Sequence, residues 1–483
     1  MSEHQEVELK LEFAEGDAAA VASLPAWTAA PAEARRLVAT YYDTPARELR
    51  DAGFTLRVRS DGDRHVQTIK AAGTAAGLFV RPEWESEVDD ARPRLDRLAG
   101  PMAPLVTPDL LDRLAPAFAT EVERAVRIIE HAGATIEVAI DRGVVGTGTR
   151  EERLHEIELE LKAGTPAALF SLARTIAEAA PVRLGMLSKA ERGFRLLDAK
   201  PGRPAKAEPI AFPPGTDAAR AFRLVAQSCL RQFRLNEAAL LAGDDAPAVL
   251  HQARVGLRRL RSALSLFAEL YQADEAAARI AEGLRASAVV LGEARDIDVL
   301  TGRLDEVEPA LDEARTSARA HVLAELRGAR HRELMIDLAE WLAIGPWLSD
   351  PASAQARATP VSEAAGVILD RFRKRLKRRG ARLAKIDDEA RHRVRIVAKK
   401  LRYATEFFAS VADTPKRQRR HERFLMALER LQEHLGELND AATAPLLARR
   451  HGLAPPPLAD RDKAIAKAAD AFDELVDARR FWR

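Results

Sequence analysis

Charged and apolar residues alternate with a period of two in several short segments of the first two hundred residues. In the first segment, residues 6–10, the side chains of Glu6, Glu8 and Lys10 share one face of a β-strand, because successive side chains of a strand point to opposite faces. Residues 156–162 repeat the pattern with one more acid. These segments are therefore predicted to be strands with one charged face and one apolar face.

About eight antiparallel strands of this kind are predicted, and such strands can close into a barrel. They are residues 6–10, 38–42, 54–59, 65–71, 81–88, 125–131, 135–142 and 156–162. If the apolar faces pack inward, as is usual for alternating strands, the charges are only solvated. The charged faces, however, hold acids in pairs and bases in pairs, with few Ser, Thr, Asn or Gln residues. This composition favours a polar lumen, with the intervening helices covering the apolar faces.

A polar lumen of this composition would suit a polyanion and its metal ions. The predicted lining is Glu6, Glu8, Lys10, Arg57, Arg59, Lys70, Arg81, Arg127, Glu158, Glu160 and Lys189. Arginine binds phosphate oxygens in a bidentate manner and lysine supplies a point charge. The candidate phosphate-binding residues are accordingly Arg57, Arg59, Lys70, Arg81, Arg127 and Lys189.

Hard carboxylate oxygens are typical ligands of Mg²⁺ or Mn²⁺. The candidate metal ligands are Glu6, Glu8 and any two of Glu156, Glu158 and Glu160, with Asp141 a weaker candidate. Lys10 could instead bridge the metal-binding acids and the substrate. A second metal ion or one of the glutamates would activate the attacking water, and the pattern does not assign the general base.

The charged motifs follow one another in the order found in a known family. They are Glu6-x-Glu8-x-Lys10, Arg57-x-Arg59, Thr68-x-Lys70, Arg81-x-Glu83-x-Glu85, Glu156-x-Glu158-x-Glu160 and Ser188-Lys189. Over residues 1 to about 198 the chain resembles the CYTH domain, the family of triphosphate tunnel metalloenzymes. The resemblance implies an eight-stranded antiparallel tunnel that binds a triphosphate together with magnesium or manganese, with Glu6, Glu8 and Lys10 in the catalytic centre.

Members of that family act on inorganic triphosphate, on thiamine triphosphate or, as adenylate cyclases, on ATP. The sequence shows no obvious aromatic pocket for a base or a thiazole ring. Tyr41 and Tyr42 could serve, whereas Trp84 falls on an apolar face and is expected to pack in a core. Inorganic triphosphate is therefore the expected substrate.

The composition and the periodicity of the chain change after residue 198. Residues 199–216 contain five prolines and two glycines, which predicts a linker. Residues 217–483 have helical periodicity and few β-branched runs. His251 aligns with His392 and Phe267 with Phe408 at one constant offset, so two related helical bundles are predicted at about 217–345 and 360–483. The whole chain is thus expected to be an α+β protein, with a barrel domain at 1–198 and a helical domain at 217–483.

Basic stripes recur on the predicted helices of both bundles. They contain His251, Arg254, Arg258, Arg259 and Arg261 in the first copy, His392, Arg395, Lys399, Lys400 and Arg402 in the second, and Arg375, Arg378 and Arg379 in a basic block upstream of the second. The stripes lack interleaved acids, so like charges four residues apart repel one another until an anion arrives. Nucleic acid is a poor candidate because the basic faces lack aromatic stacking platforms.

The duplicated pattern His251-x-x-Arg254-x-x-x-Arg258-Arg259-Leu260-Arg261 resembles the CHAD domain. That family implies α-helical bundles whose histidines and basic residues bind inorganic polyphosphate. The second copy departs from the pattern because it has Lys399 and Lys400 in place of the arginine pair. This keeps the charge but loses bidentate geometry.

Composition restricts the partners and the cellular location that the sequence predicts. The formal net charge is only +2, so no bulk charge selects a partner, and a single cysteine, Cys229, excludes an internal disulfide framework. No signal peptide is evident and no apolar run approaches the ~20 residues of a membrane span. The expectation is a cytoplasmic, metal-dependent inorganic triphosphatase that also binds polyphosphate and so could associate with polyphosphate granules. A non-catalytic polyphosphate-binding scaffold is the alternative.

Overall fold

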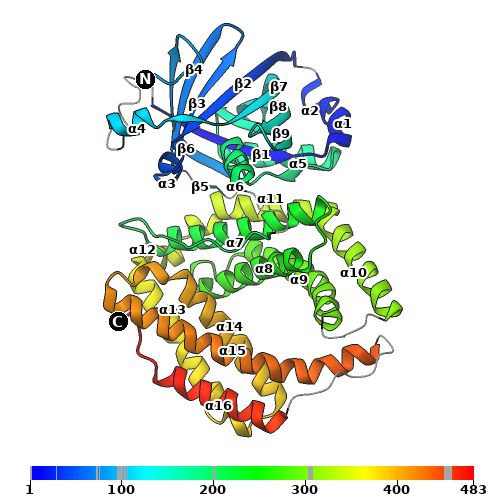
Figure 1. Ribbon diagram of the computed structural model, residues 1–483, viewed down its shortest axis with the longest axis vertical. Coiled ribbons are helices and arrows are strands. Elements are labelled where there is room, and N and C mark those ends of the chain that lie inside the picture. The colour runs from blue at the N-terminus through cyan, green and yellow to red at the C-terminus, as the bar shows by residue number, and fades with distance from the viewer. Residues whose placement is uncertain are drawn as a thin grey trace. The chain divides into compact units, whose positions relative to one another are not determined.

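The computed structural model describes residues 3–28, 30–71, 74–75, 77–94, 102, 105, 107–198, 203–302, 308–450 and 460–483. The chain forms two compact units (Figure 1). The first contains Met1–Arg203 and Arg327–Ile344, and the second contains Pro204–Leu326 and Gly345–Arg483. Four residues of the predicted linker, 199–202, lie outside the described residues.

Eight antiparallel strands of the first unit close into a barrel, as the sequence predicted (Figure 1). They are β1 (Glu3–Glu12), β2 (Glu33–Asp43), β3 (Phe54–Asp61), β4 (Arg64–Ala71), β6 (Leu78–Val88), β7 (Ala115–His131), β8 (Ala134–Gly146) and β9 (Glu151–Ala163). Their order is β1-β9-β8-β7-β2-β3-β4-β6, and β6 pairs again with β1. The short strands β5 (Thr74–Ala75) and β10 (Arg183–Leu184) pair with β6 and β1.

The register turns the charged faces inward. Residues directly opposite each other on neighbouring strands share a face, and Glu8 pairs with Glu160, Lys10 with Glu158, and Glu6 with Arg81. The intervening residues Leu9 and Leu159 are fully buried on the other face. There the helix α5 (Pro166–Ala179) contacts β1 and β9. The interpretation with a polar lumen is therefore confirmed.

The apolar outer faces of the other strands are covered by short elements. A core cluster joins Tyr42, Leu56 and Ile69 of three strands to Leu49 of α3 (Glu48–Asp51) and Leu110 of α4 (Pro108–Asp112). Trp84 packs against this cluster, as expected for the apolar face of β6. The remaining short helices are α1 (Ala18–Ala22) and α2 (Pro25–Thr28).

One end of the barrel is closed by the helix α6 (Lys189–Asp198). Its residues Ala190, Phe194 and Leu197 form a cluster with the inward-facing Ala39, Tyr41, Phe118 and Val145. The rings of Phe118 and Phe194 meet edge to face, with centroids 5.1 Å apart. Since Lys189 is the first residue of α6, this packing also carries its ammonium group into the lumen.

The second unit is helical and shows the predicted internal repeat. Its main helices are α7 (Ala218–Leu241), α8 (Pro247–Leu266), α9 (Glu275–Thr301), α10 (Pro309–Arg327), α12 (Ala354–Ala358), α13 (Val361–Gly380), α14 (Asp388–Phe407), α15 (Pro415–Arg450) and α16 (Arg461–Asp477). The bounds of α8 and α14 differ by the same offset that relates His251 to His392. No described helix combines the length and the apolar composition that a membrane span requires.

One helix of the predicted helical region packs with the barrel unit. This helix, α11 (Ala329–Ile344), contacts α5, and Arg174 of α5 lies 2.7 Å from the carboxylate of Asp337. The side chains of Met335, Ile336 and Leu342 in α11 are buried. The boundary between the units therefore crosses the sequence three times, at about residues 203, 327 and 344.

We expect Gly193→Ala to destabilise the first unit, because a Cβ atom at this position would lie 2.1 Å from the ring of Phe118. Overpacking of this kind costs about 1–3 kcal/mol. Chemical denaturation of the full chain measures the loss. Gly16→Ala is the matched control, since no atom lies within 4 Å of its added Cβ. Equal stability of the two variants would show that α6 does not pack tightly in the barrel end.

Candidate functional site

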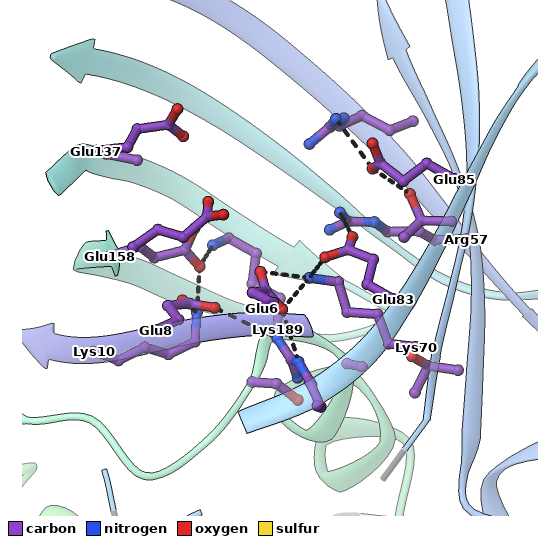
Figure 2. Close-up of a pocket in the computed structure, with 18 of the residues that line it drawn as sticks. Glu6, Glu8, Lys10, Arg57, Lys70, Glu83, Glu85, Glu137, Glu158 and Lys189 are labelled. Atoms are coloured by element: carbon purple, nitrogen blue, oxygen red, sulfur yellow. Dashed lines mark hydrogen bonds and ion pairs between the residues drawn. The ribbon is translucent and has the colours of Figure 1, made fainter. Parts of the chain in front are cut away.

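The barrel encloses a cavity of about 430 Å³ whose lining is almost entirely charged or polar. The lining residues are Glu6, Glu8, Lys10, Tyr41, Thr55, Arg57, Arg59, Thr68, Lys70, Arg81, Glu83, Glu85, Arg124, Glu137, Ala139, Glu158, Glu160, Lys162, Ser188, Lys189 and Ala190. Figure 2 shows the labelled acidic and basic side chains pointing toward one another from several strands. Opposite charges thus compensate one another inside the barrel.

Two lysines share one cluster of carboxylates toward the α6 end. Lys189 Nζ lies 2.7 Å from Asp141 and 2.8 Å from Glu158, and Lys10 Nζ contacts Glu158 as well (Figure 2). Both lysines also contact Glu156. Burial alone would lower the pKa of Lys189, but the charges of Asp141 and Glu156 outweigh it and raise that pKa above its ordinary value. Both ammonium groups are therefore held by ion pairs.

Glu6 lies in a second compensated group. Lys70 Nζ donates to both carboxylate oxygens of Glu6 at 2.9 Å, and Arg81 Nε donates to one of them at 3.0 Å. Burial would raise the pKa of Glu6, but the charges of Lys70 and Arg81 hold it far below its ordinary value. Glu6 is therefore ionised at neutral pH.

A row of three carboxylates crosses neighbouring strands, and two of them have raised pKa values. Glu8 of β1 pairs with Glu160 of β9, which pairs with Glu137 of β8. Burial, and then the charge of Glu158, raise the pKa of Glu8 to about 7. Burial also raises the pKa of Glu160. Glu8 is paired with Lys10 at 2.6 Å, and Lys162 lies 2.8 Å from Glu160 and 3.4 Å from Glu137. Because burial keeps the pKa values of Glu8 and Glu160 raised in spite of these pairs, a bound cation would stabilise their ionised forms.

The row fits a hard divalent metal ion, because Mg²⁺ and Mn²⁺ prefer carboxylate oxygens and open coordination positions for substrate phosphates. The other acidic cluster brings carboxylate oxygens of Asp141, Glu156 and Glu158 within 4.8 Å of one another. Its oxygens, however, contact Lys10 and Lys189, whose ammonium groups already supply positive charge. Glu8, Glu137 and Glu160 are a second candidate set, and their carboxylates are also paired, with Lys10 and Lys162.

The arginines nearer the open end make only loose ion pairs. Arg57 lies 3.9 Å from Glu83 and Arg59 lies 3.7 Å from Glu85, longer than a hydrogen bond. Among the described residues, the buried Nε of Arg57 has no hydrogen-bond partner. The charge of Arg57, and then burial, lower the pKa of Arg59. Both guanidinium groups can therefore donate hydrogen bonds to an anion in the lumen.

Most of the predicted tunnel residues line the lumen, but two do not. Glu156 is fully buried beneath the lining, where it contacts Lys10 and Lys189 and so holds these lysines in place. Arg127 pairs with the buried Val138, so it lies on the outer face of β7. The sequence analysis placed Arg127 inside. The structure differs because Arg124 pairs with the inward-facing Asp141, so the even-numbered residues of β7 face the lumen and Arg127 faces outward.

Three charged lining residues lie outside both the predicted site residues and the predicted motifs. Arg124 donates to Asp141 at 2.7 and 2.6 Å, in place of the expected Arg127. Lys162 continues the alternation of Glu156, Glu158 and Glu160, and lies 2.8 Å from Glu160. Glu137 precedes Asp141 by four residues in β8 and therefore lies on the same face of the strand. The alternation with a period of two was sufficient to identify Lys162 and Glu137 from the sequence. Arg124 could not be identified in this way, because the predicted strand began at residue 125 whereas β7 begins at Ala115.

The second unit contains two adjoining cavities with a shared basic wall. Their volumes are about 670 and 1010 Å³. Both are lined by Arg254 and Arg258 of α8 and by His392, Arg395 and Lys399 of α14. The smaller cavity also includes His251, and the larger one includes Arg261 and Lys400. The two copies of the repeat therefore bring their basic stripes together, and helices α8 and α14 contact each other directly.

This wall carries uncompensated positive charge. Burial lowers the pKa of Lys399 to about 7, assisted by the charges of Arg258 and Arg395. Burial also lowers the pKa of His251 to about 4, assisted by Arg295 and Arg258. Arg254 is paired with Asp296 at 3.2 Å. The charge pattern is opposite to that of the acidic row in the barrel and suits an anion.

Several predicted basic residues of the second unit lie elsewhere. Arg259 is buried, binds Glu406 and lies 4.8 Å over the ring of Phe407, so it joins α8 to α14 rather than lining a cavity. Arg402 donates to Gln432 at 3.0 Å and also pairs with Glu406. These two positions differ from the prediction because neighbouring residues of a helix point about 100° apart, so one stripe cannot include them all.

The basic block upstream of the second copy is exposed on α13. Arg375, Arg378 and Arg379 all face solvent. Arg375 and Arg379 lie near enough to Lys400 to lower its pKa, after the larger effect of burial. They extend the basic surface beyond the cavities.

We expect Glu8→Gln to change how stability depends on pH in the metal-free protein. Below pH 4.5 the Glu8 carboxyl is protonated in both states. Between pH 4.5 and about 7 only the folded state keeps the proton, so this carboxyl destabilises the wild type progressively as the pH rises. The glutamine variant should gain about 3 kcal/mol relative to the wild type across this window. Denaturation in EDTA at several pH values measures the difference.

The matched control for this experiment is Glu123→Gln, at an exposed position on the outer face of β7. Its stability difference from the wild type should stay constant over the same pH range. Parallel curves for Glu8→Gln and the wild type would contradict the assignment of Glu8 as an undercompensated acid.

The chain matches two family models in separate regions. Residues 4–194 match the CYTH domain and residues 224–449 match the CHAD domain. An inorganic triphosphatase of Haemophilus influenzae is 32% identical over 161 residues, which are 32% of this chain and 45% of that protein. The chain thus aligns with less than half of that relative. An uncharacterized protein of Mycobacterium tuberculosis is 29% identical over 405 residues, covering 76% of this chain and 75% of its own.

Two solved structures are also similar to parts of the chain. The CHAD domain of the plant Ricinus communis is 28% identical, with a TM-score of 0.45, and covers 57% of this chain and 89% of its own. A Hippeastrum protein with a dominant triphosphatase activity is 19% identical, with a TM-score of 0.33, and covers 41% of this chain and 98% of its own. The chain therefore joins an N-terminal barrel region that matches the CYTH domain to a C-terminal helical region that matches the CHAD domain.

Proposed function

We propose that the barrel hydrolyses inorganic triphosphate with the help of a divalent metal ion. The observation that carries this proposal is the enclosed lumen, whose lining combines a row of carboxylates, two of them with raised pKa values, with loosely paired arginines. The relative from Haemophilus influenzae is named an inorganic triphosphatase, which supports a triphosphatase-type hydrolase.

The arginines and lysines would bind and neutralise the phosphate oxygens. Arg57 and Arg59 have free donor capacity, and Lys70 is paired with both Glu6 at 2.9 Å and Glu83 at 3.0 Å. At an effective dielectric of about 20, a charge pair at 4 Å contributes about 4 kcal/mol. A few such contacts outweigh apolar recognition, so the bound molecule is selected by its charge.

Glu8, Glu137 and Glu160 would hold a magnesium or manganese ion, with Glu6 and Glu158 beside them. Such an ion supplies neutralisation of the phosphate charge and polarisation of phosphorus. The residues of the chain supply the orientation: Glu156 and Asp141 hold the ammonium groups of Lys10 and Lys189 at the deep end of the lumen. A raised pKa lets Glu8 release or accept a proton near neutral pH until a metal ion binds.

The closed end and the lining favour a small unsubstituted substrate. Because α6 fills one end, a linear molecule enters through the other end only. Among the described lining residues, Tyr41 supplies the aromatic ring, and its face stacks on Phe118 with centroids 4.6 Å apart. A purine or a thiazole ring would find little to stack on. This supports inorganic triphosphate over thiamine triphosphate or ATP.

The first test is phosphate release from tripolyphosphate with Mg²⁺ or Mn²⁺. Glu6→Ala/Glu8→Ala should reduce the rate about 100-fold or more, because it removes one candidate metal ligand and the partner of Lys70 and Arg81. Glu121→Ala/Glu123→Ala removes two acids at the same spacing from the exposed outer face of β7 and should keep the rate. Equal rates for both double variants would leave a non-catalytic, polyphosphate-binding scaffold as the remaining function.

We also propose that the basic wall of the helical unit binds inorganic polyphosphate. Its support is the positive charge around Arg258 and Lys399, for which the described residues provide no ion pair. A chain of phosphates would supply the missing counter-charge along α8 and α14. Such binding would bring the protein to polyphosphate granules.

Arg258→Ala/Lys399→Ala should weaken polyphosphate binding at least about tenfold, since two charge-assisted contacts are lost. Lys416→Ala/Arg419→Ala removes the same charge from α15 outside both cavities and is the matched control. The affinity of the wild type should fall as the pH rises from 6 to 8, because a bound polyanion requires the protonated form of Lys399. Titration calorimetry measures both effects, and pH-independent binding would contradict a role for Lys399.

A further inference from the structure

We propose that the larger cavity of the helical unit binds a nucleoside polyphosphate, with the phosphate chain on the basic wall and the nucleoside against α9. This inference rests on the proposed anion binding by α8 and α14 and extends it to a substrate class with an organic body. It is carried by the mixed lining of one cavity, which joins basic residues of α8 and α14 to alanines of α9.

The basic wall is strongly biased in charge. The cations that line the cavity are Arg254, Arg258, Arg261, Arg285, Arg395, Lys399 and Lys400, and Asp274 is the acidic residue of the lining. Arg285 is paired with Glu282 and Arg254 with Asp296. Arg258 and Lys399 remain without an ion pair among the described residues, and they lie at the junction of the two cavities. The phosphate chain is expected there.

Apolar side chains form another part of the same lining. Ala277, Ala281 and Ala288 lie on one face of α9, beside Arg285. Leu264 and Tyr271 continue the wall from α8 and the turn after it. Ile396 of α14 lines the same cavity and is 42% exposed. A fully charged phosphate chain cannot use this surface, whereas a base and a sugar can cover it.

The size and the polar groups of the cavity agree with such a ligand. Its volume of about 1010 Å³ is at the upper end of the range for ligand pockets. Gln272 and Asp274 stand at the start of α9, where they can meet hydroxyl or amino groups of a nucleoside. The small alanine side chains leave a flat wall, which suits the face of a base.

The decisive experiment compares ATP with tripolyphosphate, which has the same number of phosphates and no nucleoside. The full chain with Arg57→Ala/Lys70→Ala is used, in EDTA, so that binding in the barrel is suppressed. We expect ATP to bind at least fivefold more tightly than tripolyphosphate by titration calorimetry, although ATP carries less negative charge. The reverse order would overturn the proposal.

Ala281→Phe in the same background fills the apolar wall without changing charge. It should weaken ATP binding at least tenfold and leave binding of long-chain polyphosphate within twofold. Val289→Phe is the matched control, because Val289 is an exposed residue of α9 outside the cavity lining. Circular dichroism checks that both variants keep their helices. Equal effects of the two substitutions on ATP would overturn the proposal.

The experiment also separates this inference from the function on which it rests. If long-chain polyphosphate binds and ATP does not, the nucleoside site is refuted and polyphosphate binding stands. If neither molecule binds, both proposals for the helical unit fail.

Discussion

Compensation of buried charge by opposite charge is the constraint on which the barrel depends. Lys10 and Lys189 are both nearly inaccessible to solvent, and leaving either ammonium group alone at this depth would cost several kcal/mol. Asp141, Glu156 and Glu158 supply the counter-charge. These three acids thus allow cations to reach the lumen of a barrel whose outer faces are covered by apolar side chains.

The lumen of the barrel and the basic wall of the helical unit have opposite imbalances of charge. In the barrel, burial and then neighbouring acids raise the pKa values of Glu8 and Glu160, which prepares the lumen for a cation. In the helical unit, burial and then neighbouring cations lower the pKa values of Lys399 and His251, which prepares the wall for an anion. The like charges of each site repel one another most when no ligand is bound, and a ligand of opposite charge relieves this repulsion. A metal ion with triphosphate in one unit and a phosphate chain in the other would serve this purpose.

Helix α6 links the fold of the barrel to its chemistry. Phe194 is anchored between Phe118 and the barrel wall, and the same helix begins with Lys189. Closing one end therefore also fixes one cation at the deep end of the lumen. The close approach of Gly193 to Phe118 shows why a side chain is absent at that turn of the helix.

The sequence by itself determined the local pattern. A period of two identifies which side chains share a face, so the strands, the charged face and the inward set from Glu6 to Lys189 could be predicted once the family resemblance selected a lumen. The constant offset between His251 and His392 likewise predicted the helical repeat.

Only the tertiary structure decided how these faces meet. The register between strands turned Arg124 rather than Arg127 toward the lumen, and burial beneath Lys10 and Lys189 placed Glu156 below the lining. Packing between α8 and α14 buried Arg259, and contacts with α5 drew α11 to the barrel unit. Periodicity fixes the relative direction of side chains within one element, whereas burial and charge compensation arise between elements that the sequence separates by a hundred residues or more.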